Sequence, residues 1–310
     1  MQFTTPITVQ KAENPISYHS QVVLMGSCFS DSIGEKFSYS KFKTLANPFG
    51  VLFSPSAIYT IIERAVDLRL FTKSDLVFNN ELWHCFEVHS QFSTPNAEQL
   101  LSVLNEQLKS LHVFLESTSH MFVTYGTAWV YKHVERNIRV ANCHKIPQKK
   151  FEKQLLSVEE IASFSASIDD KLKTLNPTVT VTFTVSPVRH IKDGFIENNR
   201  SKAHLIAGIH HTTSGYFPSY EIMMDELRDY RFYTSDMLHP TAVAVDYIWK
   251  KLVESYTDEN TQKSMQTVVE IQNGLAHKPF HPEGEAYQRF LEKIEQKKAT
   301  LANQNPSIIF

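Results

Sequence analysis

The sequence predicts an α/β fold in which a mostly parallel sheet carries helices on both faces. The apolar run 21–25 ends in a glycine-serine pair, and the segment 30–37 that follows can form a helix. Residues 179–185 alternate strictly between apolar side chains and threonines, as a strand does. A capping box ahead of an apolar stripe predicts a helix over 157–175. Because strands alternate with helices along the chain, we expect parallel pairing.

The other expected elements follow from capping residues and periodicity. Ser54 and Pro55 suit the start of a helix, and Asn96 opens a leucine-rich helix over 96–116. We also expect strands at 121–125 and 220–224, and helices at 201–209, from Pro240 onward and over 283–298. Residues 73–95 and 130–150 lack clear periodicity, and we interpret them as insertions or loops that wall a pocket. The chain is expected to form one domain over 1–310, with 255–310 as a helical C-terminal extension.

Composition excludes several classes of function. Hydrophobic residues at 42% and charged residues at 21% are typical of a globular protein. A net charge of -2 without a dominant basic cluster argues against a nucleic-acid partner. The amino terminus lacks an apolar signal region, and no segment approaches the roughly 18 apolar residues that span a bilayer, so we expect a cytoplasmic protein without a membrane partner.

Cysteine and histidine usage favours neither disulfides nor a metal. The three cysteines are widely spaced, which suits reduced thiols. His204, His210 and His211 lie close in sequence, but they do not match a zinc-binding spacing. We therefore expect no cofactor and no metal.

Ser27 is the candidate nucleophile. It follows the first buried strand directly and precedes a helix, and ligands bind beyond the carboxyl ends of strands in open α/β sheets. Gly26 permits a sharp turn, and the start of the helix places amide donors near developing negative charge. On local sequence alone, such a serine is more often an ordinary helix cap than a nucleophile. The thiol of Cys28 is a rival nucleophile, but its neighbouring position points it in a different direction.

Asp236 and His239 are the candidates for the acid and the base that a serine nucleophile needs. They lie three residues apart immediately before a helix, so one loop can present both groups. The alternative is that Asp236 caps a turn and His239 begins the helix.

The serine near the amino terminus and the D-x-x-H block near the carboxyl terminus resemble the SGNH/GDSL hydrolase superfamily. Within it, residues 20–250 resemble the GSCFA-domain family. The segments that carry this resemblance are Gly26-Ser27-Cys28-Phe29-Ser30, Asn47-Pro48-Phe49-Gly50, Leu82-Trp83-His84, Gly126-Thr127-Ala128-Trp129, Val140-Ala141-Asn142-Cys143-His144-Lys145, Ser186-Pro187-Val188-Arg189-His190 and the run from Tyr216 to Tyr233.

The resemblance implies a flavodoxin-like three-layer α/β/α sandwich with loop insertions, and a triad of Ser27, Asp236 and His239. It also implies an oxyanion hole built from the amides of Ser27 and Gly50. Where many SGNH enzymes carry a third-block asparagine, this chain has Ala128. The groups that could substitute for that asparagine are Asn47, Thr127 and Asn199.

The expected activity is that of a serine esterase or deacylase acting on an O-acyl ester, with a small molecule or an acetylated carbohydrate as substrate. An acyl-transferase, or a catalytically silent scaffold that binds a glycan or protein partner, is the alternative. Further candidate pocket residues are His84, Trp129, Arg189, His190 and Asn199.

Overall fold

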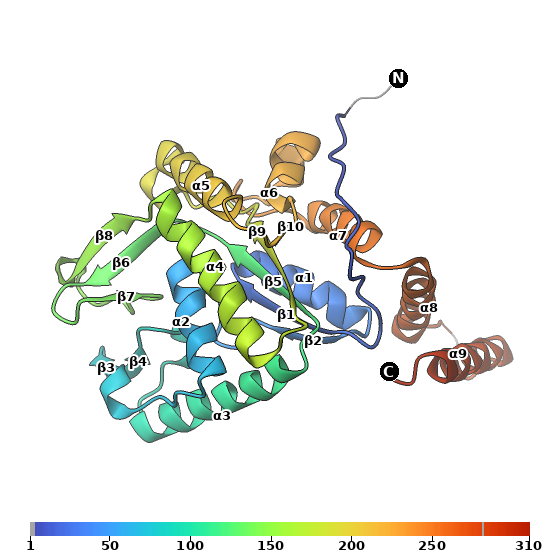
Figure 1. Ribbon diagram of the computed structural model, residues 1–310. Helices are drawn as coiled ribbons and strands as arrows, with labels where there is room; N and C mark the ends of the chain where they lie inside the picture. Colours follow the sequence, from blue (N-terminus) through green and yellow to red (C-terminus); the bar gives the residue numbers. More distant parts are fainter. Residues whose placement is uncertain (1–3, 281) are drawn as a thin grey trace.

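A five-stranded parallel sheet forms the centre of the protein (Figure 1). The computed structural model describes residues 4–280 and 282–310. The strands lie in the order β2 (Lys43–Ala46), β1 (Gln21–Gly26), β5 (His120–Tyr125), β9 (Thr180–Val185) and β10 (Gly215–Tyr216), and every neighbouring pair is parallel. Counted within the sheet alone, this is the 2-1-3-4-5 order of flavodoxin-like folds. The prediction of a parallel α/β sheet is confirmed.

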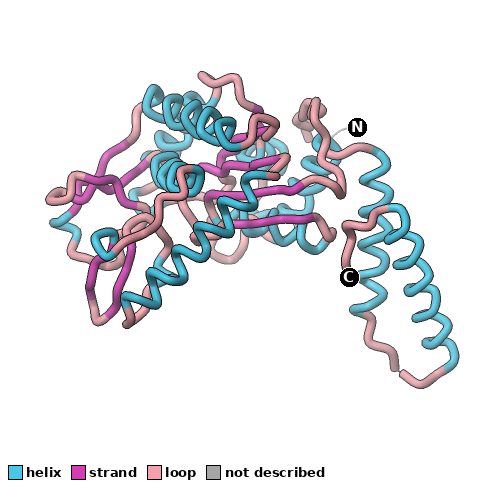
Figure 2. Tube along the Cα trace, turned by 60° about the horizontal axis from the view of Figure 1, so that its bottom comes forward, coloured by secondary structure: helices cyan, strands magenta, loops and turns pink. Residues whose placement is uncertain are grey.

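Helices cover both faces of the sheet, which gives the three layers of an α/β/α sandwich (Figures 1 and 2). One face carries α2 (Pro55–Val66), α3 (Ala97–Glu116), α4 (Val158–Leu175) and α5 (Phe195–Ile209), and the other carries α1 (Cys28–Tyr39) and α7 (Ala242–Tyr256). Successive residues of a strand point to opposite faces. In β1, Val23 therefore packs in the first apolar cluster and Leu24 in the second, and both are buried.

The helix caps lie where the sequence places them. The side chain of Ser54 accepts a hydrogen bond from the amide of Ala57 at the start of α2, and Asn96 accepts one from Gln99 at the start of α3. The capping box of Ser157 ahead of α4 is formed in both directions. One boundary differs: α5 begins at Phe195, whereas the prediction began at 201. The prediction missed the first turns because Phe195 and Ile196 are exposed and residues 197–200 are polar, so no apolar stripe marks them.

The two segments interpreted as loops contain strands, so that prediction is wrong in detail. Residues 73–95 hold an antiparallel hairpin of β3 (Leu76–Asn79) and β4 (Leu82–Cys85). Within and around 130–150, β6 (Trp129–His133), β7 (Ile138–Val140) and β8 (Phe151–Leu155) form a separate antiparallel sheet. These strands have three to five residues, and their polar side chains hide the alternation that normally identifies a strand.

The strand predicted at 220–224 is also wrong. Residues Ser219–Glu221 form the short helix α6, and Ile222–Leu227 continue it with π-type pairing. A short apolar run fits a buried strand or a buried helix equally well. The fifth strand is instead β10, whose two residues are too few to show a pattern.

The C-terminal part of the chain is an antiparallel helix pair, α8 (Glu259–Ala276) and α9 (Glu285–Gln304), which extends beyond α7 (Figure 2). The helix predicted over 283–298 corresponds to α9. Across residues 4–280 and 282–310, no helix combines the length and apolarity needed to cross a lipid bilayer.

Candidate active site

Ser27 lies at the carboxyl end of β1, where the strand order reverses between β1 and β5. This reversal is the position at which open α/β sheets bind ligands. The Ser27 hydroxyl accepts a hydrogen bond from the amide of Phe29 (3.3 Å) and so caps α1. The residue is fully buried. The structure thus confirms Ser27 as a helix cap, and its role as a nucleophile stays a prediction.

Gly26 lets the nucleophile segment pass close to β5. Its φ is +143°, and a Cβ at this position would overlap the carbonyl group of Thr124. The amide of Ser27 continues the ladder by donating to that same carbonyl oxygen (3.1 Å). The backbone at Ser27 is thus hydrogen-bonded to the sheet and does not form a free loop.

The residues expected to form the oxyanion hole are already engaged with one another. Gly50, with a φ of +73°, donates its amide to the carbonyl oxygen of Asn47 (2.8 Å). The side chain of Asn47 accepts from the amide of Gly26 (2.8 Å) and donates to Asp31 (2.7 Å). Asn47 therefore acts as a brace behind Ser27, and the amides of Ser27 and Gly50 both donate to backbone oxygens.

The loop before α7 holds Asp236 and His239 as a bonded pair. Nδ1 of His239 lies 2.6 Å from Oδ2 of Asp236. The other carboxylate oxygen accepts from the hydroxyl of Thr234 (2.7 Å) and from the amides of Leu238 (2.8 Å) and His239 (3.0 Å). These donors, the Thr234 hydroxyl foremost, hold the pKa of Asp236 well below its usual range.

Nδ1 of His239 carries the proton in this pair, because a carboxylate can only accept. Nε2 is left as the basic nitrogen. The side chains of His239 and Asp236 are 48% and 44% exposed, whereas Ser27 is buried. Within the described part of the chain, no hydrogen bond joins Ser27 to His239. The structure therefore pairs Asp236 with His239 and keeps Ser27 buried, without a hydrogen bond to that pair among the described residues.

Lys202 is buried near the segment that begins at Ser27. This lysine was not singled out from the sequence. Its ammonium donates to the carbonyl oxygens of Gly126 (2.8 Å) and Ser186 (2.7 Å), which follow β5 and β9. Burial lowers the pKa of Lys202 to about 7, and a nearby Cys28 thiolate would raise it. The signal in the sequence was its position three residues before Leu205, on the apolar stripe of α5.

His190 lies near Lys202 and near His239. The loop of residues 234–239 that holds Asp236 and His239 is called the acid–base loop below, after the roles predicted from the sequence. Burial, followed by the charges of Lys202 and His239, lowers the pKa of His190 to about 3, so the ring is neutral near pH 7. Its Nε2 is buried and has no hydrogen-bond partner among the described residues. Its amide donates to the side chain of Asn198 (2.8 Å), a second buried residue that the sequence analysis missed.

The chain matches models of known protein families. The model of the GSCFA family matches residues 21–252, and that of the GSCFA domain protein, C-terminal domain, matches residues 268–310. The chain belongs to the GSCFA family. A search of curated proteins gave no match. The GSCFA region contains the entire central sheet, Ser27, Lys202 and the Asp236–His239 pair, so all groups described above lie within one family unit.

The side chains predicted to stand in for an oxyanion-hole asparagine at Ala128 are hydrogen-bonded elsewhere. Ala128 is fully buried, and its amide donates to the hydroxyl of Ser201 (2.7 Å). Thr127 shares a hydrogen bond with the same hydroxyl (3.1 Å). Asn199 is exposed and accepts from Asn198. Neither Thr127 nor Asn199 has a hydrogen bond to Ser27 among the described residues, and the Asn47 side chain is bonded to Gly26 and Asp31.

The other candidate pocket residues are distributed over the molecule. His84 is buried in the β3–β4 hairpin, where its two ring nitrogens bond to Ser93 and to the backbone of Asn79. Trp129 donates its ring N–H to the carbonyl oxygen of Glu197 on α5 (3.3 Å). Arg189 lies beside the acid–base loop, to which its amide is joined through the carbonyl oxygen of Leu238 (3.2 Å). Arg189 and His190 are thus brought to the site, and His84 is not.

Cys28 is a poorer nucleophile than its position suggests. Burial raises the pKa of its thiol, and the negative charge of Asp31 adds to this effect. The reactive form of cysteine is the thiolate, which these two effects disfavour.

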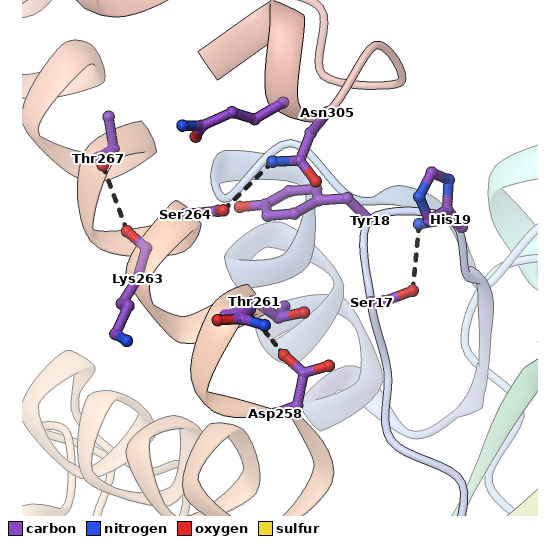
Figure 3. A pocket seen from close by; sticks show the side chains of 11 residues that line it. Ser17, Tyr18, His19, Asp258, Thr261, Lys263, Ser264, Thr267 and Asn305 are labelled. Carbon is purple, nitrogen blue, oxygen red and sulfur yellow. Dashed lines mark hydrogen bonds between the residues drawn. The ribbon is translucent and has the colours of Figure 1, made fainter. Parts of the chain in front are cut away.

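A polar hollow lies between the GSCFA C-terminal helices and the segment that precedes β1 (Figure 3). Asn305 donates to Ser264 across it (3.2 Å), and Ser307 donates to the backbone of Tyr18 (2.8 Å). Tyr18 precedes β1, so this hollow lies at the opposite end of that strand from Ser27. It belongs to the contact that fastens the C-terminal helices and not to the serine site.

Proposed function

We propose that this chain is a serine-dependent hydrolase that cleaves an O-acyl ester, with Ser27 as nucleophile and His239 and Asp236 as base and orienting acid. The observation that carries the proposal is the bond from His239 Nδ1 to Asp236, in a loop that holds both groups rigidly. A serine hydroxyl becomes nucleophilic only when a base accepts its proton, and an imidazole fixed by a carboxylate is the commonest such base.

The chemistry follows from the protonation states. Nε2 of His239 takes the proton of the Ser27 hydroxyl while Oγ forms a bond to the ester carbonyl carbon. The tetrahedral intermediate collapses, the C–O bond to the alcohol breaks, and the imidazolium returns its proton to the leaving oxygen. Water, deprotonated by the same nitrogen, then releases the acid from the acyl-enzyme. An O-acetyl group on a carbohydrate is the substrate class that the SGNH resemblance suggests.

Reaction at Ser27 requires the closed arrangement to open. Ser27 is fully buried, and its amide is bonded to Thr124. His239 must therefore approach the hydroxyl, and the substrate oxygen must replace a carbonyl as the partner of at least one amide. Catalytic hydrogen bonds are often long or unformed in unliganded enzymes and tighten when substrate binds.

The test is covalent labelling of the folded protein with a fluorophosphonate, which reacts with activated serines. We expect wild-type protein to be labelled at Ser27 and Ser27→Ala to remain unlabelled. Ser32→Ala is the matched control, because Ser32 lies on the same helix and bonds only to a backbone carbonyl. Asp236→Asn should slow the reaction by about 10⁴-fold, since the imidazole loses its orienting carboxylate.

A second candidate is a catalytically silent scaffold that binds a glycan or a protein partner. The observations that favour it are the burial of Ser27 and the presence of Ala128 in the third block. Losing one oxyanion donor typically costs about 2.7 to 4 kcal/mol of transition-state stabilisation. If folded wild-type protein shows no labelling under conditions that label a known serine esterase, the hydrolase proposal fails and the scaffold is favoured.

A further inference from the structure

A hollow beside the acid–base loop contains two arginines and little opposing charge. It lies between the segment after β9 and the chain that links the π-type turn to α7. Its lining residues are Arg189, Met223, Met224, Arg228, Asp229, Tyr230 and Tyr233.

Arg189 is held in place by aromatic rings rather than by a carboxylate. Its guanidinium carbon lies 4.4 Å from the ring centre of Tyr233 and 5.4 Å from that of Tyr230. One amino group donates to the Tyr233 hydroxyl (3.0 Å). Among the described residues, no carboxylate lies within salt-bridge distance of Arg189. Since a guanidinium has five N–H donors, Arg189 has donors beyond those that face the hydroxyls of Tyr233 and Tyr230.

Arg228 brings a second positive charge to the same hollow. It ends the π-type turn with φ and ψ of 28° and 36°, an uncommon conformation for a residue other than glycine. Its side chain is exposed, and the described residues provide it with no ion-pair partner. π-type turns inside helices occur frequently at functional sites.

The single carboxylate in the lining is already neutralised. Asp229 bonds through one oxygen to the guanidinium of Arg231 (2.9 Å) and through the other to the Arg231 amide (2.8 Å). Among residues 4–280 and 282–310, neither guanidinium of the hollow has a carboxylate partner, and the one carboxylate in its lining is bonded to Arg231. Guanidinium groups bind carboxylate and phosphate oxygens with charge-assisted, often paired hydrogen bonds.

The hollow shares its wall with the acid–base loop. Tyr233 is followed by Thr234, whose hydroxyl donates to Asp236 and whose amide donates to the carbonyl oxygen of His239 (2.8 Å). The amide of Arg189 donates to the carbonyl oxygen of Leu238 (3.2 Å). A group bound in the hollow would thus lie against the segment that positions His239.

We propose that this hollow binds an oxyanion group, a carboxylate or a phosphate, carried by the molecule whose ester is cleaved at Ser27. The location of the bound ester rests on the proposed function, whereas binding of the oxyanion does not. Arg189 supplies a fixed, stacked guanidinium, and Arg228 closes over the ligand from the exposed side.

The first test measures binding without catalysis. Succinate, inorganic phosphate and the neutral succinamide are titrated calorimetrically into Ser27→Ala protein. We expect one or both anions to bind and succinamide not to bind, and the tighter anion identifies the oxyanion. Arg189→Gln and Arg228→Gln should each weaken binding by about tenfold or more.

Arg200→Gln is the matched control, because Arg200 is exposed on α5, outside the lining, and pairs with Glu197. It removes the same net charge and should leave the affinity unchanged. Arg189→Gln removes a stacked side chain and could perturb folding, so Arg228→Gln, at an exposed position, decides the matter. Absence of anion binding to folded protein, or equal binding by Arg228→Gln and the control, would overturn the proposal.

A second test separates this inference from the proposed hydrolase. If the enzyme is active, wild-type protein should cleave mono-p-nitrophenyl succinate with a higher kcat/KM than p-nitrophenyl acetate. Arg228→Gln should lose that preference, measured as the ratio of the two kcat/KM values, whereas Arg200→Gln should retain it. Anion binding without fluorophosphonate labelling would remove the hydrolase and keep the oxyanion site. Labelling without anion binding would support the hydrolase and overturn the oxyanion site.

Discussion

Replacing Lys202 by methionine tests whether its buried amine stabilises the carboxyl ends of β5 and β9. Methionine has a similar length and no charge, so it fills the site without its hydrogen bonds. Lys202 is 1% exposed and donates to the carbonyl oxygens of Gly126 and Ser186. Each buried carbonyl left without a donor costs about 1–3 kcal/mol. Removal of a buried ammonium partly offsets this loss, so a stability change at one pH is not diagnostic.

The dependence on pH is diagnostic. The pKa of Lys202 falls from 10.5 to about 7 on folding. Between these values the unfolded chain binds one more proton than the native state, and stability rises with pH wherever that holds. The stabilisation is complete above 10.5 and is lost as the pH falls through about 7. The slope is about 1.4 kcal/mol per pH unit, which amounts to about 3 kcal/mol between pH 7 and 9.5.

The assay is urea unfolding of wild-type and Lys202→Met protein at several pH values from 6.5 to 9.5. The free energy of unfolding of wild type minus that of the variant should rise by about 3 kcal/mol over this range. Buried tyrosines are present in both proteins, so their contributions cancel. Lys109→Met is the control, because Lys109 is exposed and makes no ion pair within the described ranges. A difference that stays constant or falls with rising pH would refute the lowered pKa.

Two further substitutions test buried polar contacts, one beside Ser27 and one between α2 and the segment after β4. Asn47→Ala should lower the free energy of unfolding by about 2–4 kcal/mol, because the Gly26 amide loses its acceptor, Asp31 loses a donor and alanine must adopt a φ of +39°; a loss below about 1 kcal/mol in urea unfolding would contradict the brace. Arg64→Met should cost about 3–5 kcal/mol, since it leaves Glu87 without its buried partner (2.6 Å). The double variant Arg64→Met/Glu87→Gln should recover part of this loss, and no recovery would count against the ion pair.

The sequence predicted the architecture well where elements are long and amphipathic. Caps and apolar stripes predict the helices α2, α3 and α4, and strict alternation predicts β9. The strands that were missed have two to five residues, too few for a period to appear. The strand prediction at 222–224 was wrong because local apolarity cannot distinguish a buried strand from a buried turn of helix.

The site was predictable to the extent that its geometry is local. Asp236 and His239 are three residues apart, and their pairing follows from one turn. Lys202 could be recognised only as a charge on an apolar stripe, since the carbonyl groups that bind it lie 76 and 16 residues away. The engagement of the Ser27 and Gly50 amides is set by strand pairing and loop closure, which no sequence pattern reveals.

If Ser27 is the nucleophile that we propose, its burial makes the rate of reaction depend on the fraction of molecules in which the site is open. If only an open minority reacts, the observed rate is the rate of the open form multiplied by its fraction, and each 1.4 kcal/mol favouring the closed form slows the reaction about tenfold. The amide of Ser27 reports on that fraction, because its bond to Thr124 must break before its hydrogen can exchange with solvent. A molecule that accelerates both hydrogen exchange at Ser27 and its labelling would be an activator, and its structure would point to the natural substrate.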